Sequence, residues 1–84
     1  MIVINKTRYF FNDILAITNY KDGRILSNVV TSETYYIHEK VFKIIEPATN
    51  KLVTFEDLYD SNYSYEEFES FIQDLINKKI FIIE

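Results

Sequence analysis

Few side chains in this chain are of a type that could perform catalysis or hold a metal. Its 84 residues include one His, His38, one Gly and no Cys. Without Cys there is no thiol nucleophile, disulfide or thiolate metal site, and a single Gly cannot build a Gly-rich phosphate loop. His38 has no partners at metal-ligand spacing, and with no elbow-type Ser motif nearby it does not indicate a Ser–His–acid triad. We predict no catalytic residue, no metal and no cofactor, in a protein that is not an enzyme.

The charged residues point to helix ends rather than to acid/base chemistry. The pairs Glu56-Asp57 and Glu66-Glu67 are best explained as first-turn acids, which the helix dipole favours. The net charge of −4 opposes binding to a phosphate backbone. No apolar run approaches the roughly 20 residues of a membrane helix, and no signal peptide is evident. Together with the absence of Cys, this predicts a cytoplasmic protein that contacts neither nucleic acid nor membrane.

Three strands are predicted in the first half of one domain, residues 1–84. Ile14–Thr18 is rich in residues that favour a pleated surface. The Asp22-Gly23 dipeptide signals a hairpin turn, since Gly tolerates the positive φ that such turns require. Arg24–Val30 is the returning strand, and Thr34–His38 follows after a polar turn. Strands joined by short turns form an antiparallel meander.

Two short helices are predicted next. Glu39–Glu46 has one broad apolar face, and we expect His38 to cap it and Pro47 to stop it. Residues 48–53 are predicted to be a loop. Thr54 is a good N-cap for a brief second helix over Phe55–Asp60.

The third helix has the clearest local signal. Ser64 and Glu67 form a capping-box pattern, and Lys78 and Lys79 close the helix. Its apolar stripe has helical spacing and consists of Phe68, Phe71, Ile72, Leu75 and Ile76.

Both ends of the chain leave alternatives open. Ile2–Ile4 is either a strand or a docked arm, and Arg8–Phe11 is apolar without a clear assignment. Ile80–Ile83 is either a final strand or an apolar segment beneath the last helix. The predicted fold is α+β and winged-helix-like, with one three-stranded antiparallel sheet followed by three helices. DNA binding is disfavoured because the third helix is acidic over its first two turns.

Thr34–Ile37 is the candidate working surface, because we expect it to be an edge strand. An edge presents unpaired N–H and C=O groups to which a second chain can add. The backbone ladder then gives affinity, and side-chain pockets give specificity. Alternation places Tyr35 and Ile37 on one face and Thr34 and Tyr36 on the other. Spacing alone leaves open whether these faces are simply core and solvent.

The motifs of this chain resemble those of the PqqD-like family, the recognition elements for precursors of ribosomally synthesised and post-translationally modified peptides (RiPPs). The resemblance covers about three quarters of the chain and rests on apolar, degenerate motifs: Asp22–Asn28, Tyr35–His38, the helix with Phe42, Ile44 and Ile45, Thr54–Leu58, the pattern Phe68-x-x-Phe71-Ile72-x-x-Leu75, and Ile80. His38 stands where the family usually has Asn. A longer loop, Pro47–Lys51, replaces the family's Gly turn, and residues 1–11 match no family motif.

The resemblance implies a winged-helix-like domain that binds the leader region of a precursor peptide by strand addition. The leader would lie in a groove between the third strand and the third helix, and the domain would deliver it to a modifying enzyme: a radical-SAM enzyme, a cyclodehydratase, a dehydratase or a lasso-type protease. Asp74 is a candidate partner for a leader Lys or Arg. The alternatives are a winged-helix protein–protein adaptor or, with less support, a DNA-binding winged helix. The implied peptide-binding residues are Thr34, Tyr35, Tyr36, Ile37, Phe68, Phe71, Ile72, Leu75 and Ile76.

Overall fold

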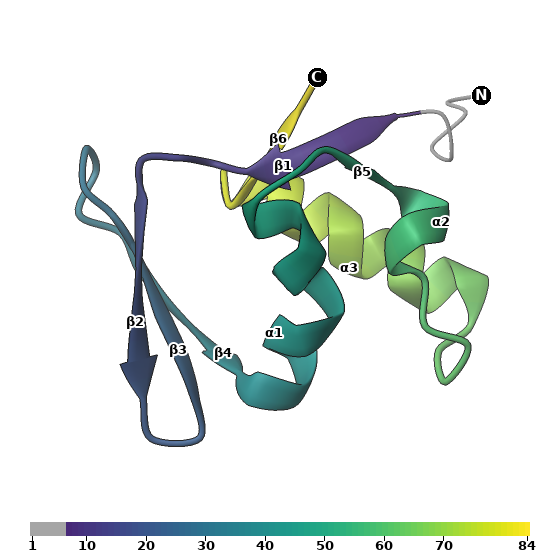
Figure 1. Cartoon of the computed structure of the whole chain (residues 1–84), viewed down its shortest axis with the longest axis horizontal. Coiled ribbons are helices and arrows are strands. Elements are labelled where there is room, and N and C mark those ends of the chain that lie inside the picture. The colour runs from purple at the N-terminus through teal and green to yellow at the C-terminus, as the bar shows by residue number, and fades with distance from the viewer. Residues whose placement is uncertain (1–6) are drawn as a thin grey trace.

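A computed structural model describes residues 7–84 as an α+β structure with two three-stranded antiparallel sheets (Figure 1). The predicted segment Ile2–Ile4 lies outside the described residues. In chain order the elements are β1 (Arg8–Phe11), β2 (Leu15–Tyr20), β3 (Gly23–Asn28), β4 (Thr34–His38), α1 (Glu39–Ile45), the 3₁₀ helix η2 (Glu46–Thr49), β5 (Val53–Thr54), α2 (Phe55–Leu58), α3 (Tyr65–Asn77) and β6 (Phe81–Ile83).

The expectation of a single sheet is wrong, because β5, β1 and β6 form a second one. Tyr9 pairs with Val53 on one side and with Ile83 on the other. Tyr9 and Phe11 are buried on one face of β1, as period-2 alternation requires. The apolar tail is therefore a strand. Local patterns missed this sheet because its three strands come from distant parts of the chain and have two to four residues each.

The other sheet has the order β2-β3-β4 and contains the three predicted strands. Its first turn needs Gly23 for a reason other than the one expected. Lys21, not Gly23, has the positive φ, at 52°. A Cβ on Gly23 would lie 2.3 Å from the carbonyl oxygen of Ile37 and 2.6 Å from the hydroxyl of Tyr36. Gly23 is therefore required for the close approach of β4 to β3.

The turn between β3 and β4 begins earlier than predicted, because β3 ends at Asn28 rather than Val30. The buried side chain of Asn28 accepts hydrogen bonds from the backbone N–H groups of Val30, at 2.9 Å, and Thr31, at 3.0 Å. These bonds offer the chain a local alternative to the ladder. Val29 and Val30 are consequently held at the surface, with 67% and 71% of their area exposed.

The helix caps are confirmed, while two helix boundaries differ from the prediction. His38 Nδ1 accepts from the N–H of Lys40, and Thr54 and Ser64 each cap a helix as half of a capping box. The α-helix α1 ends before Pro47 as predicted, at Ile45, and Pro47 stands in the first turn of the following 3₁₀ helix η2, where no donor is needed. The predicted loop over 48–53 therefore contains the end of η2 and the start of β5, and α2 ends at Leu58.

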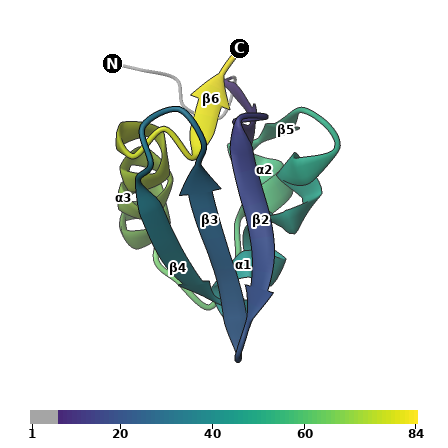
Figure 2. The ribbon, with the colours of Figure 1, turned by 90° about the vertical axis from the view of Figure 1, so that its left-hand side faces the viewer.

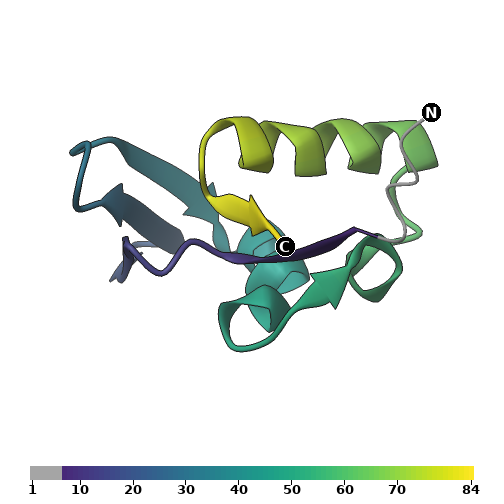
Figure 3. The same ribbon diagram turned by 90° about the horizontal axis from the view of Figure 1, so that it is seen from above.

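Helix α3 packs along one side of the fold, in contact with β6. Figure 3 shows it on one side of β1, with η2 on the other. Figure 2 shows that β4 is the strand of its sheet nearest to α3. Phe68, Ile72 and Leu75 point into the core, where each is at most 3% exposed. One face of α3 thus packs on the core, and its flank borders β4.

Candidate functional site

β4 is an outermost strand, as expected from the sequence, because the sheet order β2-β3-β4 leaves one of its edges free among the described residues. Its side chains alternate as predicted: Ile37 is buried and Tyr35 half-buried on the inner face, while Thr34, Tyr36 and His38 are exposed. This edge runs beside α3 (Figure 2).

The register shows which backbone groups point outward from this edge. The ladder is continued by hydrogen bonds from Glu39 N–H to Asp22 and from Asn28 N–H to Glu33, at 2.9 and 2.8 Å. Hydrogen-bonded and non-bonded pairs alternate in an antiparallel ladder. In the register of β3 and β4, Tyr35 and Ile37 therefore bond to β3. The backbone N–H and C=O groups of Thr34 and Tyr36 and the N–H of His38 face away from the sheet, whereas the C=O of His38 accepts the first hydrogen bond of α1.

A groove with a volume of about 410 Å³ separates this edge from α3. Residues from β4 form one wall, and Phe71 and Asp74 of α3 belong to the other. Its lining consists of Thr34, Tyr35, Tyr36, Ile37, His38, Val41, Phe71, Asp74, Leu75, Lys78 and Ile80. Both polar and apolar side chains line it, from Thr34 and His38 on the strand side to Phe71 on the helix side.

Lys78 links the two walls at one end of the groove. Its Nζ lies 2.9 Å from Asp74 Oδ2 and 5.5 Å from the centre of the Tyr35 ring. Both partners are partly solvated, so each contact is worth only about 0.5–1 kcal/mol. Asp74, expected to be available for a cation of the ligand, is already paired with Lys78 in the protein.

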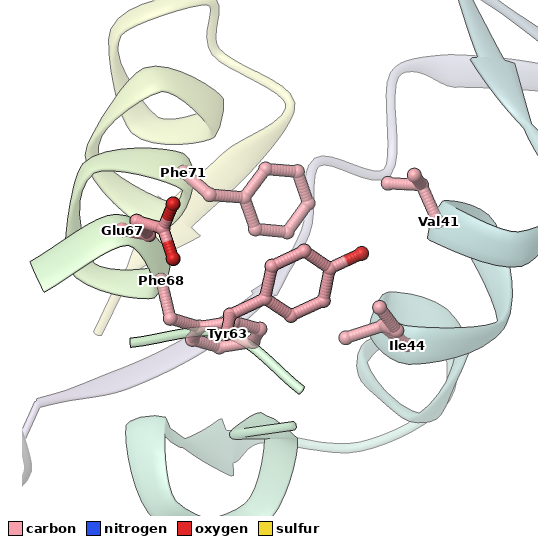
Figure 4. A pocket seen from close by; sticks show the side chains of 6 residues that line it. All are labelled: Val41, Ile44, Tyr63, Glu67, Phe68 and Phe71. Atoms are coloured by element: carbon pink, nitrogen blue, oxygen red, sulfur yellow. The ribbon is translucent and has the colours of Figure 1, made fainter. Parts of the chain in front are cut away.

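A second hollow, of about 290 Å³, lies between α1 and the first half of α3 (Figure 4). Its lining is apolar except for Glu67 and the hydroxyl of Tyr63, and consists of Val41, Ile44, Tyr63, Glu67, Phe68 and Phe71. Val41 and Phe71 line the groove as well. The two hollows are therefore neighbours that share a wall.

The residues implied by the resemblance fall into three groups in the structure. Thr34–Ile37, Phe71 and Leu75 line the groove beside β4, and Phe68 lines the second hollow. Ile72 is fully buried and Ile76 half-buried, and both are absent from the linings of the two hollows.

Sequence reasoning missed several residues of the two linings. Val41 and Ile44 lie on the broad apolar face predicted for the first helix, and Lys78 is one of the cations predicted to close the third helix. Tyr63 lies just before the third helix, where its ring is 6.3 Å from that of Phe68. The breadth of the apolar faces of α1 and α3 was the available signal, because such faces can serve the core and a hollow together.

A polar cluster occupies the exposed face at the hairpin tip. The Tyr36 hydroxyl donates a short hydrogen bond to Asp22 Oδ1, and His38 Nε2 lies 3.3 Å from Asp22 Oδ2. The Tyr36 hydrogen bond is the main cause that lowers the pKa of Asp22, and the same bond raises the pKa of Tyr36. The cluster ties the β2–β3 turn to β4 and thereby fixes the position of the edge.

Within residues 7–84, no group of three or more His, Asp or Glu side chains is arranged to hold a metal ion. No helix of that region is long and apolar enough to cross a membrane. Comparison of the chain with models of known families, with curated protein sequences and with solved structures gave no match.

Proposed function

We propose that this protein binds the leader region of a ribosomally synthesised precursor peptide and delivers it to a modifying enzyme. The leader adds as a strand to β4, in the groove against α3. The observation that carries the proposal is the open edge of β4, whose outward backbone groups at Thr34, Tyr36 and His38 border that groove. In this proposal the fold is winged-helix-like, with the β2–β3 hairpin as the wing.

Strand addition explains why the edge and the groove occur together. Each ladder hydrogen bond adds a modest net contribution, about 0.5–1.5 kcal/mol. Apolar side chains of the leader would remove further surface from water against the half-buried Val41 and Phe71. The protein acts by binding and positioning, without catalysis, in the cytoplasm. Its second partner is the enzyme that modifies the peptide, of radical-SAM, cyclodehydratase, dehydratase or lasso-protease type.

A winged-helix protein–protein adaptor is the second candidate. The turn that holds Val29 and Val30 at the surface favours it, since both side chains are more than two-thirds exposed. DNA binding has less support, because Glu66, Glu67 and Glu69 on α3 would face the phosphates.

The proposal is tested by titrating the isotope-labelled protein with the leader segment of a short peptide encoded beside its gene. Backbone amide shifts of Thr34–His38 and of Phe71–Lys78 should be the largest. Shifts concentrated at Val29 and Val30 would instead support the adaptor. Shifts along the exposed acidic face of α3 with duplex DNA, weakening steeply with salt, would support DNA binding.

A pair of Pro variants tests the ladder directly. Thr34→Pro removes one outward N–H at the first residue of an edge strand, where Pro is tolerated. Leader binding should weaken about fivefold, as the loss of one hydrogen bond of about 1 kcal/mol predicts. Asn19→Pro is the matched control, because by the same alternation its N–H points outward from the opposite edge, β2. Equal leader affinity in both variants would refute strand addition at β4.

A further inference from the structure

The hollow between α1 and α3 has a buried aromatic floor and partly exposed walls. Phe68 is 2% exposed at its base, whereas Tyr63 at the rim is 41% exposed. Val41, Ile44 and Phe71 are half-buried around it. Figure 4 shows the rings of Tyr63, Phe68 and Phe71 turned toward the α1 side chains Val41 and Ile44 across the hollow. An apolar surface of this kind is partly wet in the free protein and gains from being covered.

The dimensions of the hollow suit one large side chain. Its volume of about 290 Å³ falls at the lower limit of the roughly 300–1,000 Å³ typical of pockets for whole small molecules. The rings already present lie at aromatic contact distances, with 5.7 Å between Phe68 and Phe71. A further ring can therefore add in an edge-to-face or offset arrangement.

The position of the hollow relates it to the groove beside β4. On α3 the groove is lined by residues from Phe71 to Lys78 and the hollow by residues from Glu67 to Phe71. Their centres are thus about six residues apart on the helix, or about 9 Å at the helical rise. An extended chain covers that distance in about three residues. A peptide paired with β4 reaches the hollow beyond the His38 end of the strand.

Glu67 gives the rim of the hollow a fixed negative charge. Its Oε1 accepts from the N–H of Ser64 at 3.0 Å, while its own N–H donates to Ser64 Oγ at 3.1 Å. The hydrogen bonds to Ser64 lower the pKa of Glu67, so the carboxylate is ionised at neutral pH. It cannot turn away without breaking the cap of α3. An acidic residue beside the hollow would therefore be repelled.

We infer that this hollow is an anchor pocket for one aromatic side chain of the bound peptide, about three residues from the centre of the segment paired with β4. The anchor's neighbours in the peptide are neutral or basic. Antiparallel addition, the more stable of the two pairings, puts the anchor on the N-terminal side of that segment. This inference rests on the proposed function and specifies which side chain the bound peptide must carry, and where.

The first test uses probes too small to form a strand. N-acetyl-phenylalaninamide and the α-amide of N-acetyl-glutamate are titrated separately into isotope-labelled protein. The aromatic probe should shift Val41, Ile44 and Phe71, with a dissociation constant on the order of 1 mM, and the acidic probe should not. No shift in these residues with the aromatic probe, or equal shifts with both, would overturn the anchor pocket.

The second test uses the leader and matched variants on one helix. Ile44→Gln puts a polar group into the wall and should weaken leader binding at least about tenfold, the loss expected when an aromatic side chain is no longer buried. Lys43→Gln, at an exposed neighbouring site of α1 that is absent from the hollow's lining, should bind like the wild type. Equal leader affinity of Ile44→Gln and wild type would overturn the anchor and leave strand addition intact. A leader that fails to bind the wild type would overturn the proposed function itself.

A charge variant tests the rim. Glu67→Gln keeps a capping-box residue at the same position and removes only the charge. It should raise the affinity for a leader with Glu next to the aromatic residue about threefold or more and leave a neutral leader unchanged. If the ratio of the affinities for the neutral and the Glu-containing leader is the same in wild type and Glu67→Gln, the role assigned to Glu67 is overturned.

Discussion

The substitution Gly23→Ala separates two opposing effects on stability. Gly23 does not have positive φ, so Ala fits its backbone conformation and should stabilise the protein by about 0.4–1 kcal/mol through the unfolded state. The added Cβ, however, would lie 2.3 Å from the carbonyl oxygen of Ile37. That oxygen belongs to the backbone and can move only if β4 moves. Overpacking of this kind costs about 1–3 kcal/mol.

We therefore expect a net loss of about 1–2 kcal/mol in the free energy of unfolding. For a domain of this size the melting temperature should fall by about 5–15 °C. Urea unfolding followed by tyrosine fluorescence and circular dichroism measures the change. Ser27→Ala is the control, since Ser27 is half-buried on the same face of β3. An unchanged or raised unfolding midpoint for Gly23→Ala would refute the close-packing argument.

A double variant identifies which contact is responsible. Tyr36 supplies two of the three nearest atoms to the added Cβ, and the Ile37 oxygen supplies the third. Gly23→Ala should cost less in a Tyr36→Ala background, yet more than zero. A full cost in that background would assign the whole effect to the backbone of β4.

Three further predictions concern single side chains. Tyr36→Phe removes the hydrogen bond that mainly lowers the pKa of Asp22, so that pKa should rise toward its usual value. Carboxyl ¹³C titration checks this, and an unchanged Asp22 pKa would contradict it. Burial is the main cause that raises the pKa of Tyr9 to about 12 in the folded protein. The unfolded chain therefore loses the Tyr9 proton at a lower pH than the folded protein. The free energy of unfolding should fall by up to roughly 2–3 kcal/mol as pH rises from about 10 to 12. Tyr9→Phe should remove this part of the alkaline loss, measured by urea unfolding at each pH, and an identical loss in both proteins would contradict it. Ile72→Asp places a charge in the core and should abolish folding, whereas Phe71→Ser should retain the fold and weaken leader binding; circular dichroism and titration distinguish the two.

Elements set by neighbouring residues could be predicted from the sequence. The N-terminus of α3 is determined by Ser64 and Glu67, which lie three positions apart and bond to each other's backbone. The edge strand Thr34–His38 was also predicted correctly, because the turn before it and the cap at His38 are local. The second sheet could not be predicted, since the strands that pair with β1 lie more than 40 residues away in the sequence.

The sequence does not show which apolar residues of α3 face the core and which line the hollows, because this depends on where β4 and α1 lie. Phe71 and Ile72 are adjacent in one apolar stripe, yet Ile72 is fully buried and Phe71 lines both hollows. One residue step turns the helix by about 100°, and the stripe is wide enough for both directions. Only the positions of β4 and α1 show which residue meets the groove.

Strand pairing with β4 uses only the backbone N–H and C=O groups of the bound peptide. Every residue except Pro has both groups. A chain that pairs with Thr34, Tyr36 and His38 through them can change most of its paired side chains during evolution without losing the ladder. The apolar hollow near Val41 is sensitive to each change in the side chain that enters it. In the peptide, the residues paired with β4 should therefore vary widely among related sequences. The one residue that enters the hollow should accept few replacements.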